Sequence, residues 1–434
     1  MSDYMFMLES HLSADQNRVL EQVQAAAGAA GVNLFLTGGG MRDMLGGFQI
    51  RDLDFSVEGH ALKVAKALEE QGARTLSVDE NRRSVELVFP SGVTVQVALS
   101  RQERYARTGG KPQVTPATIQ EDLRGRDFTV NAMALSLNRA SRGLLLDPTN
   151  GLADLGRREL RSTHPYVFYD DPSRLLRLVR LRVRLSFTVE DRTGTQYDNA
   201  RAAHVEDQIS PRTLLDELRH IAAEPGPAEV LQALDRDGLL ALFSPALAGS
   251  KTGLQALVRM EKAARLVESA GLVVEPQLGP FLLALTDKLT PKDKSALFKA
   301  VDLPKAEIDR MRSLEPRARK VEQALKSARV QKPSHVYQIL ADARSDEMVF
   351  LLSNSAQRVV PERIRNYLQK YMPAMQAVPA AEWEALEGQP GTPKYNRQRQ
   401  ALLASHLDVK VRKPAVPEPP PAPPLEAAAR GRER

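Results

Sequence analysis

The chain has 434 residues, more than one hydrophobic core usually covers, and its 42% hydrophobic and 26% charged residues predict a soluble globular protein with two or more domains. It contains no cysteine, which excludes a disulfide framework and thiolate chemistry and leaves Asp, Glu, His and carbonyl oxygen as metal ligands. Sixty Lys and Arg against 54 Asp and Glu give a net charge of +6, which identifies a nucleic-acid binder only if the positive charges cluster.

The N-terminal segment has neither the basic region nor the long apolar run of a signal peptide. No later apolar run approaches the length of a membrane span. We therefore expect a cytoplasmic protein with no membrane partner.

The first 150 residues combine helical and strand patterns, which predicts a mixed α and β domain. Periodicity and turn residues indicate a helix at 15–30, a strand ending in glycines at 32–40, a strand at 51–58, a helix at 60–72, and a hairpin at 84–100 that turns at Pro90-Ser91-Gly92. From about residue 170 to 375 nearly every segment has a helical period interrupted by Pro or Gly. The fold class expected from these patterns is α+β, with a mixed head followed by a long helical part.

Two aspartates, Asp52 and Asp54, are separated by one residue on the second predicted strand. Residues i and i+2 of a strand point to the same face, so both carboxylates can converge on a divalent ion while Leu53 and Phe55 face the core. Oxygen ligands with open positions for phosphate suit Mg²⁺. The alternative is a solvated strand with two ordinary acidic residues.

The glycines at the end of the first strand supply a second element of the same chemistry. Without side chains, Gly38 and Gly39 allow backbone N–H groups to approach a triphosphate, and Arg42 is close enough to add positive charge. A plain turn from strand to helix is the alternative for the glycines alone. A glycine turn followed by Asp-x-Asp on the next strand is much rarer than either part.

Four segments in order carry a resemblance to a known family: GGGMRDMLGG with RDLDF (38–55), EDLRGRDFTVNAMAL (121–135), DPTNGLADLGRRELR (147–161) and YDDPSRLLRLVRLRVRLSF (169–187). They resemble the motifs of the class II template-independent nucleotidyltransferases, which comprise bacterial CCA-adding tRNA nucleotidyltransferases and poly(A) polymerases. The resemblance covers about residues 34–220. It implies a polymerase-β-like nucleotidyltransferase head at 1–150, a helical neck that recognises the base at 151–250, a helical RNA-binding body and tail at 251–412, and a disordered Pro-rich tail at 413–434.

In the 169–187 segment, Asp171 and Arg174 are three residues apart, which places them on one face of a helix. The carboxylate could accept from the exocyclic amino group that cytosine and adenine share, while Arg174 donates to the neighbouring acceptors. Asp171 followed by Pro also fits a simple helix N-cap. The alternation in VRLRVRLSF could equally indicate a strand, and the resemblance favours the helix.

The resemblance also assigns the site residues and partners. Two Mg²⁺ ions would activate the 3′-hydroxyl of a tRNA and stabilise the departing pyrophosphate, with CTP and ATP as substrates and no protein partner. The residues implied are catalytic and metal-binding Asp52 and Asp54, and nucleotide-binding Gly38, Gly39, Arg42, Arg126, Asp127, Asn131, Asp171, Arg174, Arg177 and Arg180. By residue pattern alone, Arg126, Asp127 and Asn131 would equally fit a structural salt bridge.

The chain departs from the family pattern at several positions. Gln96 stands where an acidic residue is common, so a third metal-site carboxylate is in doubt, and Gly125 replaces the first Arg of an Arg-Arg-Asp triplet. The tRNA acceptor stem is expected on the basic segment 310–334, for which a solvated helix face is the alternative. A poly(A) polymerase, a non-catalytic RNA-binding relative and, more remotely, a metal-dependent glycosyltransferase are the alternative functions.

Overall fold

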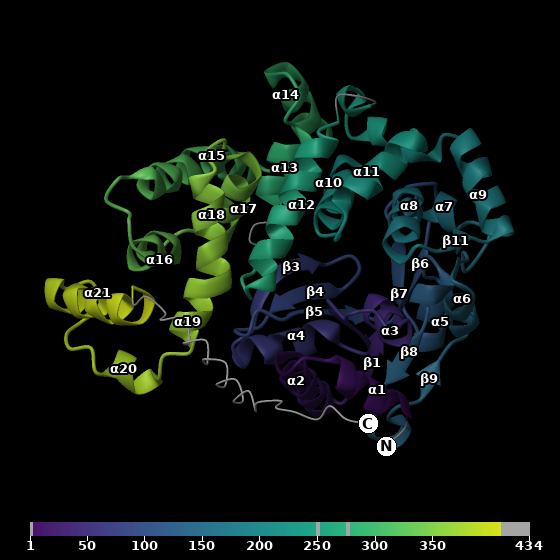
Figure 1. Ribbon diagram of the computed structural model, residues 1–434. Coiled ribbons are helices and arrows are strands. Elements are labelled where there is room, and N and C mark those ends of the chain that lie inside the picture. Colours follow the sequence, from purple (N-terminus) through teal and green to yellow (C-terminus); the bar gives the residue numbers. More distant parts are fainter. Residues whose placement is uncertain (1–2, 249–251, 275–277, 409–434) are drawn as a thin grey trace, which may run out of the picture. The chain divides into compact units, whose positions relative to one another are not determined.

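The computed structural model describes residues 3–248, 252–274 and 278–408, and the chain divides into two compact units (Figure 1). Unit 1 comprises residues 1–265 and 274–315, and unit 2 comprises residues 266–273 and 316–434. The Pro-rich tail expected at 413–434 lies outside the described residues. Within the part that is described, no helix is both long and apolar enough to cross a membrane.

The strands of the head assemble into one mixed sheet. They are β1 (Asn33–Thr37), β2 (Leu53–Glu58), β3 (Arg74–Asp79), β4 (Ser84–Val88), β5 (Thr94–Leu99), β8 (Ala134–Ser136) and β9 (Leu145–Leu146). Among the described residues the strand order is β3-β4-β5-β2-β1-β8-β9. β2 runs parallel to β5, and all other neighbours are antiparallel. The predicted hairpin is confirmed as β4 and β5, and Gly92 in its turn has a φ of +85°.

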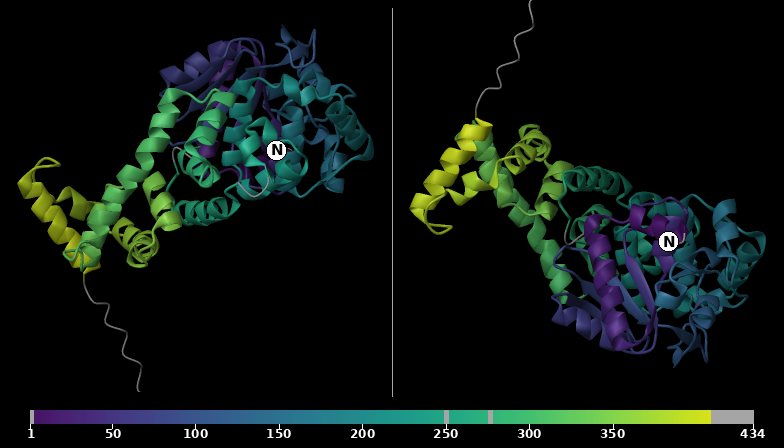
Figure 2. Two further views of the ribbon diagram at one scale, coloured as in Figure 1. Left: turned by 90° about the horizontal axis from the view of Figure 1, so that it is seen from above. Right: turned by 90° about the horizontal axis from the view of Figure 1, so that it is seen from below.

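Helices α2 (Ala14–Ala30) and α4 (Ala61–Glu70) pack on one face of this sheet, as the view from below in Figure 2 shows. Both helices were predicted from their periodicity. Ser13 begins α2 with a capping box, and Gly31 ends it in the left-handed conformation. Leu53 and Phe55 of β2 join the apolar side chains of α2 and α4 in the core. Asp54 therefore belongs to the opposite face, which these helices leave uncovered.

Short elements and then helices complete unit 1. They are α1 (Asp3–His11), α3 (Gly38–Leu45), β6 (Arg101–Arg104), β7 (Gln113–Pro116), α5 (Ile119–Arg124), η1 (Thr129–Asn131), α6 (Gly151–Arg157), β10 (Glu159–Leu160), α7 (Val167–Asp170), α8 (Arg174–Leu185), β11 (Thr188–Val189), α9 (Asp191–Ala202), α10 (Pro211–Ala222), α11 (Pro227–Arg236), α12 (Leu254–Ser269), α13 (Leu278–Leu285) and α14 (Pro291–Ala300). The alternating VRLRVRLSF segment forms helix α8, so the strand alternative is wrong there. Leu175, Leu178 and Leu181 of α8 share one core with Phe128 and Val130.

Unit 2 is helical in its described residues. Helices α12 and α15 (Lys305–Lys326) cross the division between the units, at residues 265/266 and 315/316. After α15, unit 2 contains α16 (Pro333–Ala341), α17 (Ser345–Asn354), α18 (Val359–Asn366), α19 (Met372–Gln376), α20 (Ala380–Glu384) and α21 (Pro393–Leu407). Ser334, at the start of α16, donates from its backbone N–H and its hydroxyl to the Asp408 carboxylate after α21. Met375, Val378 and Leu403 form the apolar contact of α19 and α21. The predicted α+β class, a mixed head followed by helices, is confirmed.

Two glycines of α6 provide a test of how tightly this helix packs on η1. A Cβ at Gly151 would lie 2.1 Å from the carbonyl oxygen of Thr129, whereas nothing lies within 4 Å of one at Gly156. We expect Gly151→Ala to lower the free energy of unfolding by about 1 to 3 kcal/mol through overpacking. Gly156→Ala, the control, should leave it unchanged or raise it by up to about 1 kcal/mol. Urea unfolding monitored by circular dichroism measures both, and equal midpoints would contradict the packing.

Candidate active site

The glycine turn lies where β1 ends and α3 begins. Gly38 has a φ of +68°, a left-handed conformation that a side chain would strain. A Cβ at Gly38 would lie 3.1 Å from Asp54 Oδ2 and 3.4 Å from Arg126 Nη1. One at Gly39 would lie 3.5 Å from Arg42 Nη2. The missing side chains leave a space bordered by one carboxylate and two guanidinium groups, so the structure brings these five predicted residues together.

The two aspartates differ in how the fold supports them. Asp54 belongs to β2, whereas Asp52 lies in the segment just before that strand. Leu53 and Phe55 are buried, as predicted. Neither aspartate side chain has a hydrogen-bond or ion-pair partner among the described residues. Two carboxylates without a protein partner fit a divalent cation. The described part of the chain contains no cluster of three or more Asp, Glu or His side chains that could hold a metal.

The electrostatic environment of Asp54 combines burial with opposing charges. Burial and the neighbouring Asp52 raise the pKa of Asp54 to about 6, while Arg126, Arg177 and Arg42 act in the opposite direction. The ionised carboxylate is therefore destabilised by its protein environment even though three arginines lower the pKa. A bound cation would remove that destabilisation by replacing the missing partner.

Gln96 lies beside Asp54 in the register of β5 with β2, and Glu86 of β4 lies beside Gln96. Residues paired in register point to the same face, so a neutral amide is the nearest side chain to Asp54 on that strand. The Glu86 carboxylate accepts a hydrogen bond from the Ser77 hydroxyl at 3.0 Å. The departure seen in the sequence at Gln96 thus falls directly next to a proposed metal ligand.

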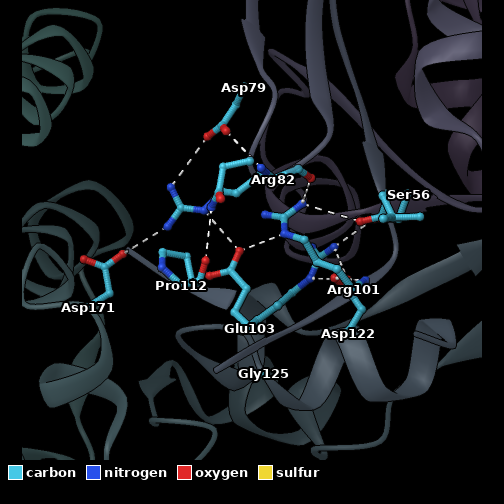
Figure 3. A network of polar contacts seen from close by, with 12 residues as sticks. Ser56, Asp79, Arg82, Arg101, Glu103, Pro112, Asp122, Gly125 and Asp171 are labelled. Atoms are coloured by element: carbon cyan, nitrogen blue, oxygen red, sulfur yellow. Dashed lines mark hydrogen bonds and ion pairs between the residues drawn. The ribbon is translucent and has the colours of Figure 1, made fainter. Parts of the chain in front are cut away.

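Arg126 is fixed by an acid and a hydroxyl of the head. Its Nη2 and Nε lie 2.8 Å and 3.1 Å from Asp122 Oδ2, and Nη2 also donates to Ser56 Oγ at 3.0 Å. Ser56 follows Asp54 by two residues on β2, so the guanidinium lies along the same face of the strand. Ser56 and Asp122 are labelled in Figure 3. Asp122, which sequence reasoning did not select, orients Arg126 beside the glycine turn.

Buried Arg42, Asn131 and Asp127 form one polar chain with Arg177, whose side chain is 44% exposed. Arg42 Nη1 donates to Asn131 Oδ1 at 2.7 Å, and Asn131 Nδ2 donates to Asp127 Oδ1 at 3.1 Å. Arg177 Nε lies 2.7 Å from Asp127 Oδ2. Burial would raise the pKa of Asp127, but Arg177 and Arg174 hold that pKa below its ordinary value. These four predicted residues are thus connected, and Asp127 links the neck helix to the head.

Asp171 is not part of a helix, which corrects the expected geometry of the base-reading pair. Helix α7 ends at Asp170 and α8 begins at Arg174, so the two residues are joined by a turn. Asp171 Oδ1 accepts from the backbone N–H and the hydroxyl of Ser173, at 3.1 Å and 2.6 Å. Arg174 donates to the carbonyl oxygens of Val167 and Gly125. One oxygen of Asp171 therefore stabilises the turn before α8, but Asp171 is not the helix N-cap of the alternative interpretation, because Ser173 holds that position and no side chain caps the helix. Its other oxygen, Oδ2, accepts no hydrogen bond from a described residue.

Figure 3 shows what Oδ2 faces: Arg82, from the turn between β3 and β4, lies 3.9 Å away. Arg82 is itself held by Glu103 at 3.1 Å, and Glu103 is also 2.7 Å from Arg101. Although burial alone would raise it, Arg82 and Arg101 lower the pKa of Glu103 to about 2. This network reaches from the head to Asp171. No sequence spacing indicated it.

Arg180 is separate from the residues around Asp54. It is only 6% exposed and is paired with two carboxylates, Glu217 at 3.3 Å and Glu224 at 2.9 Å. A guanidinium neutralised in this way has little charge left for a triphosphate. Four apolar residues of the same helix are buried: Leu175, Leu176, Val179 and Leu181.

Part of the basic segment 310–334 is neutralised inside unit 2. Arg317 lies 2.9 Å from Asp346 and 3.0 Å from Glu347. Arg319 and Lys326 lie 2.8 Å and 3.7 Å from Glu322. The net positive charge that this segment presents to solvent is smaller than its residue count suggests.

The chain resembles proteins of known activity. Residues 34–161 match the model of the poly A polymerase head domain. An A-adding tRNA nucleotidyltransferase of Geobacter sulfurreducens is 31% identical over 261 residues, covering 60% of this chain and 30% of that protein. A CC-adding tRNA nucleotidyltransferase of Deinococcus radiodurans is 36% identical over 202 residues, covering 46% and 53%. The chain thus spans about half or less of the length of these relatives.

Solved structures support the fold over nearly the whole chain. A CCA-adding enzyme in an apo form aligns with a TM-score of 0.55 and 22% identity, covering 95% of this chain and 96% of that one. A Thermotoga maritima CCA-adding enzyme complexed with tRNA aligns with a TM-score of 0.51 and 20% identity over the same shares. At these identities the comparison establishes the fold alone.

The raised pKa of Asp54 gives a pH-dependent effect on stability. An unfolded aspartate titrates near about 3.9, so between pH 4 and 6 the wild-type folded state loses stability as Asp54 ionises, and the loss is complete above the folded pKa. Asp54→Asn cannot ionise. We expect it to be more stable than the wild type by about 1 to 3 kcal/mol at pH 8 without divalent metal, and to lose most of this gain at pH 4.

Chemical denaturation at the two pH values in the presence of a chelator measures this difference. Asp79→Asn, which removes an acid of β3 that is 42% exposed, serves as the control for a general charge effect. A variant at Asp54 that is less stable than the wild type at pH 8 would contradict the assigned environment.

Proposed function

We propose that this chain, which belongs to the family of CCA-adding tRNA nucleotidyltransferases and poly(A) polymerases, adds CMP and AMP from CTP and ATP to the 3′ end of tRNA. Relatives with A-adding and CC-adding activities support tRNA as the acceptor. We infer that addition of a complete or partial CCA end takes place in the cytoplasm. The alternative within the family is poly(A) addition.

The observation that carries the proposal is the arrangement around Gly38. A turn without side chains faces Asp54, an unpartnered carboxylate, and two guanidinium groups border the same space. Phosphate groups need donors and positive charge, and divalent ions need carboxylates, so nucleotide triphosphate with metal satisfies every group there. A glycosyltransferase would also need a metal and a diphosphate, but it leaves Asp127, Asn131 and the neck arginine Arg177 without a role.

We infer that Asp52 and Asp54 would hold two Mg²⁺ ions, which would supply Lewis acidity to the RNA 3′-hydroxyl and to the departing pyrophosphate. In the reaction the 3′-oxygen attacks the α-phosphorus while its proton passes to solvent. The bond between the α-phosphorus and the oxygen that bridges to the β-phosphorus breaks, and pyrophosphate leaves with that oxygen. Gly38 and Gly39 give the triphosphate access to backbone N–H groups. Arg126 provides positive charge that Asp122 keeps in position.

Arg42 and Arg177 carry the remaining charge for the triphosphate in this proposal. Asn131 and Asp127 lie between them and fix both guanidinium groups through hydrogen bonds and an ion pair. Positioning and electrostatic stabilisation by these groups supply most of the rate in phosphoryl transfer. We assign Arg180, paired with Glu217 and Glu224, to the stability of the neck in place of the predicted phosphate contact.

For base selection we retain Asp171 and Arg174. With Oδ1 engaged by Ser173, the remaining acceptor is Oδ2, which lies 3.9 Å from Arg82 and would receive the amino group of cytosine or adenine. Uracil and guanine present a carbonyl oxygen at the equivalent position, and two acceptors facing each other are unfavourable. No nucleic-acid template is needed for this choice.

We assign the proposed domains as a catalytic head at 1–150, a neck at 151–250, and an RNA-binding body and tail at 251–412. The acceptor stem would contact arginine and lysine side chains of the helical part through its phosphates. A non-catalytic RNA-binding relative would not require Asp52 and Asp54 to be free of protein partners. Their free carboxylates favour the enzyme.

One assay tests the function. Purified protein is incubated with Mg²⁺, labelled CTP or ATP, and tRNAs that end before, within or after the CCA sequence. We expect incorporation of no more than three nucleotides, with the choice of nucleotide depending on the tRNA end. Long runs of AMP would support poly(A) addition, and no incorporation on any acceptor would refute the catalytic proposal.

Two substitutions test the site. Asp54→Asn should lower the rate of incorporation by roughly 100-fold or more, because it removes a ligand that acts in the transition state, while the protein stays folded. Asp171→Asn should reduce the preference for CTP and ATP over UTP and GTP by roughly 10- to 100-fold, since an amide can donate as well as accept. Unchanged kcat for Asp54→Asn, or an unchanged nucleotide preference for Asp171→Asn, would refute the respective role.

A further inference from the structure

A buried cluster of charges lies between the head and the neck of unit 1 and includes Arg180, which is assigned above to the stability of the neck. We name it the Glu224 cluster, and it consists of Asp43, Arg51, Arg180, Arg184, Glu217 and Glu224. The acids and Arg180 are at most 7% exposed in their side chains, Arg184 is 16% exposed and Arg51 is 35% exposed. So many charges shielded from water need mutual compensation.

Glu224, just after helix α10, is the centre of this cluster. Its Oε1 accepts a hydrogen bond from Arg180 Nη1 at 2.9 Å. Its Oε2 has no hydrogen-bond donor but lies 3.7 Å from Arg51 Nη1 and 3.8 Å from Arg184 Nε. One carboxylate therefore attracts two arginines of the neck and one of the head.

The head arginine directly precedes a proposed metal ligand. Arg51 donates from Nη1 to the carbonyl oxygen of Ala223 at 3.2 Å, which attaches it to the end of α10. Asp52 lies before β2 begins, so the hydrogen bonds of the sheet do not fix its backbone. A Cβ at Gly40 of α3 would lie 3.1 Å from the carbonyl oxygen of Asp52, so the backbone at Asp52 packs directly against α3. The hydrogen bond from Arg51 to Ala223 therefore restricts the position of the neighbouring Asp52.

A second path leads from Glu224 to the predicted phosphate contact. Arg184 Nη2 lies 2.6 Å from Asp43 Oδ2. Asp43 Oδ1 accepts from Arg42 Nε and Nη2 at 2.9 Å and 2.7 Å. Asp43 thus receives a guanidinium on each oxygen, and the orientation of Arg42 depends on where Arg184 lies.

We propose that Glu224 is a positioning residue of the active site: through Arg51 it places Asp52 for metal binding, and through Arg184 and Asp43 it orients Arg42 toward the triphosphate. This inference rests on the proposed function, because it assigns a purpose to Asp52 and Arg42. Glu224 itself touches neither substrate nor metal. A merely structural ion pair would stabilise the fold without changing how the site binds a cation.

The test replaces the carboxylate by an amide of the same shape. In Glu224→Gln the acceptor for Arg180 remains, while the charge that attracts Arg51 and Arg184 is lost. We expect the dissociation constant for Mn²⁺, measured on the full nucleotide-free chain by the electron paramagnetic resonance of free Mn²⁺, to rise about 5- to 10-fold. The Mg²⁺ concentration for half-maximal incorporation should rise by a similar factor, and kcat at saturating Mg²⁺ should fall below that of the wild type, because Arg42 is no longer held in its orientation.

Glu217, within α10, offers a matched control seven residues before Glu224. It is as buried as Glu224 and pairs with Arg180, but it has no ion pair with Arg51 or Arg184 among the described residues. Glu217→Gln removes the same charge from the same cluster, so it reports any general electrostatic or folding effect. We expect a loss of thermal stability comparable to that of Glu224→Gln, with Mn²⁺ affinity unchanged. Equal Mn²⁺ affinities for the two variants would overturn the proposal.

Arg51→Gln tests the link to Asp52 independently, and it applies if Glu224→Gln fails to fold. Arg51→Gln should raise the dissociation constant for Mn²⁺ to a similar extent. The double variant with Glu224→Gln should have a dissociation constant no higher than that of either single variant. Additive losses would overturn the path through Arg51. A wild type that binds Mn²⁺ yet adds no nucleotide would refute the proposed function while leaving the positioning role standing, whereas a wild type that binds no Mn²⁺ would overturn the positioning role itself.

Discussion

The arrangement of the head depends on the carboxylate of Asp54, which lies on the sheet face that α2 and α4 leave uncovered. Asp54 has no hydrogen-bond donor among the described residues, yet it lies where burial raises its pKa. The turn at Gly38 approaches it without a side chain, and the guanidinium of Arg126 is attached through Ser56 to the same strand. Arg126 favours the ionised form of Asp54, and neither it nor the turn at Gly38 donates a hydrogen bond to the carboxylate. The carboxylate oxygens are therefore left for a cation.

Helix α8 distributes its arginines among carboxylates of different origin. Arg177 binds Asp127 of the head, Arg180 binds Glu217 and Glu224 of the neck, and Arg184 binds Asp43 of the head. These residues follow one another at intervals of three and four, so they occupy one side of the helix, while its leucines enter the core that begins at Phe128. The helix is thereby bound to the head by charge on one side and by apolar packing on the other.

The fold and the head of the site could be predicted from the sequence because their signals are local. Strand alternation placed Asp54 opposite Leu53 and Phe55, and the glycine turn followed directly from Gly38 and Gly39. The ion pairs could not be predicted in this way, since Arg184 and Asp43 are 141 residues apart and no periodicity selects one distant acid over another. Asp171 was misplaced for a related reason: the proline after it permits either a helix start or a turn, and the hydrogen bonds to Ser173 decide for the turn.

Gln96 limits the negative charge on the sheet face that carries Asp54. The side chain next to Asp54 on β5 is an amide. A carboxylate there would add a negative charge beside an aspartate that is already difficult to ionise, and Arg42, Arg126 and Arg177 would have to balance three acids in place of two. The amide places no further charge beside Asp54, so a neutral neighbour on β5 helps to set the ionisation of that carboxylate.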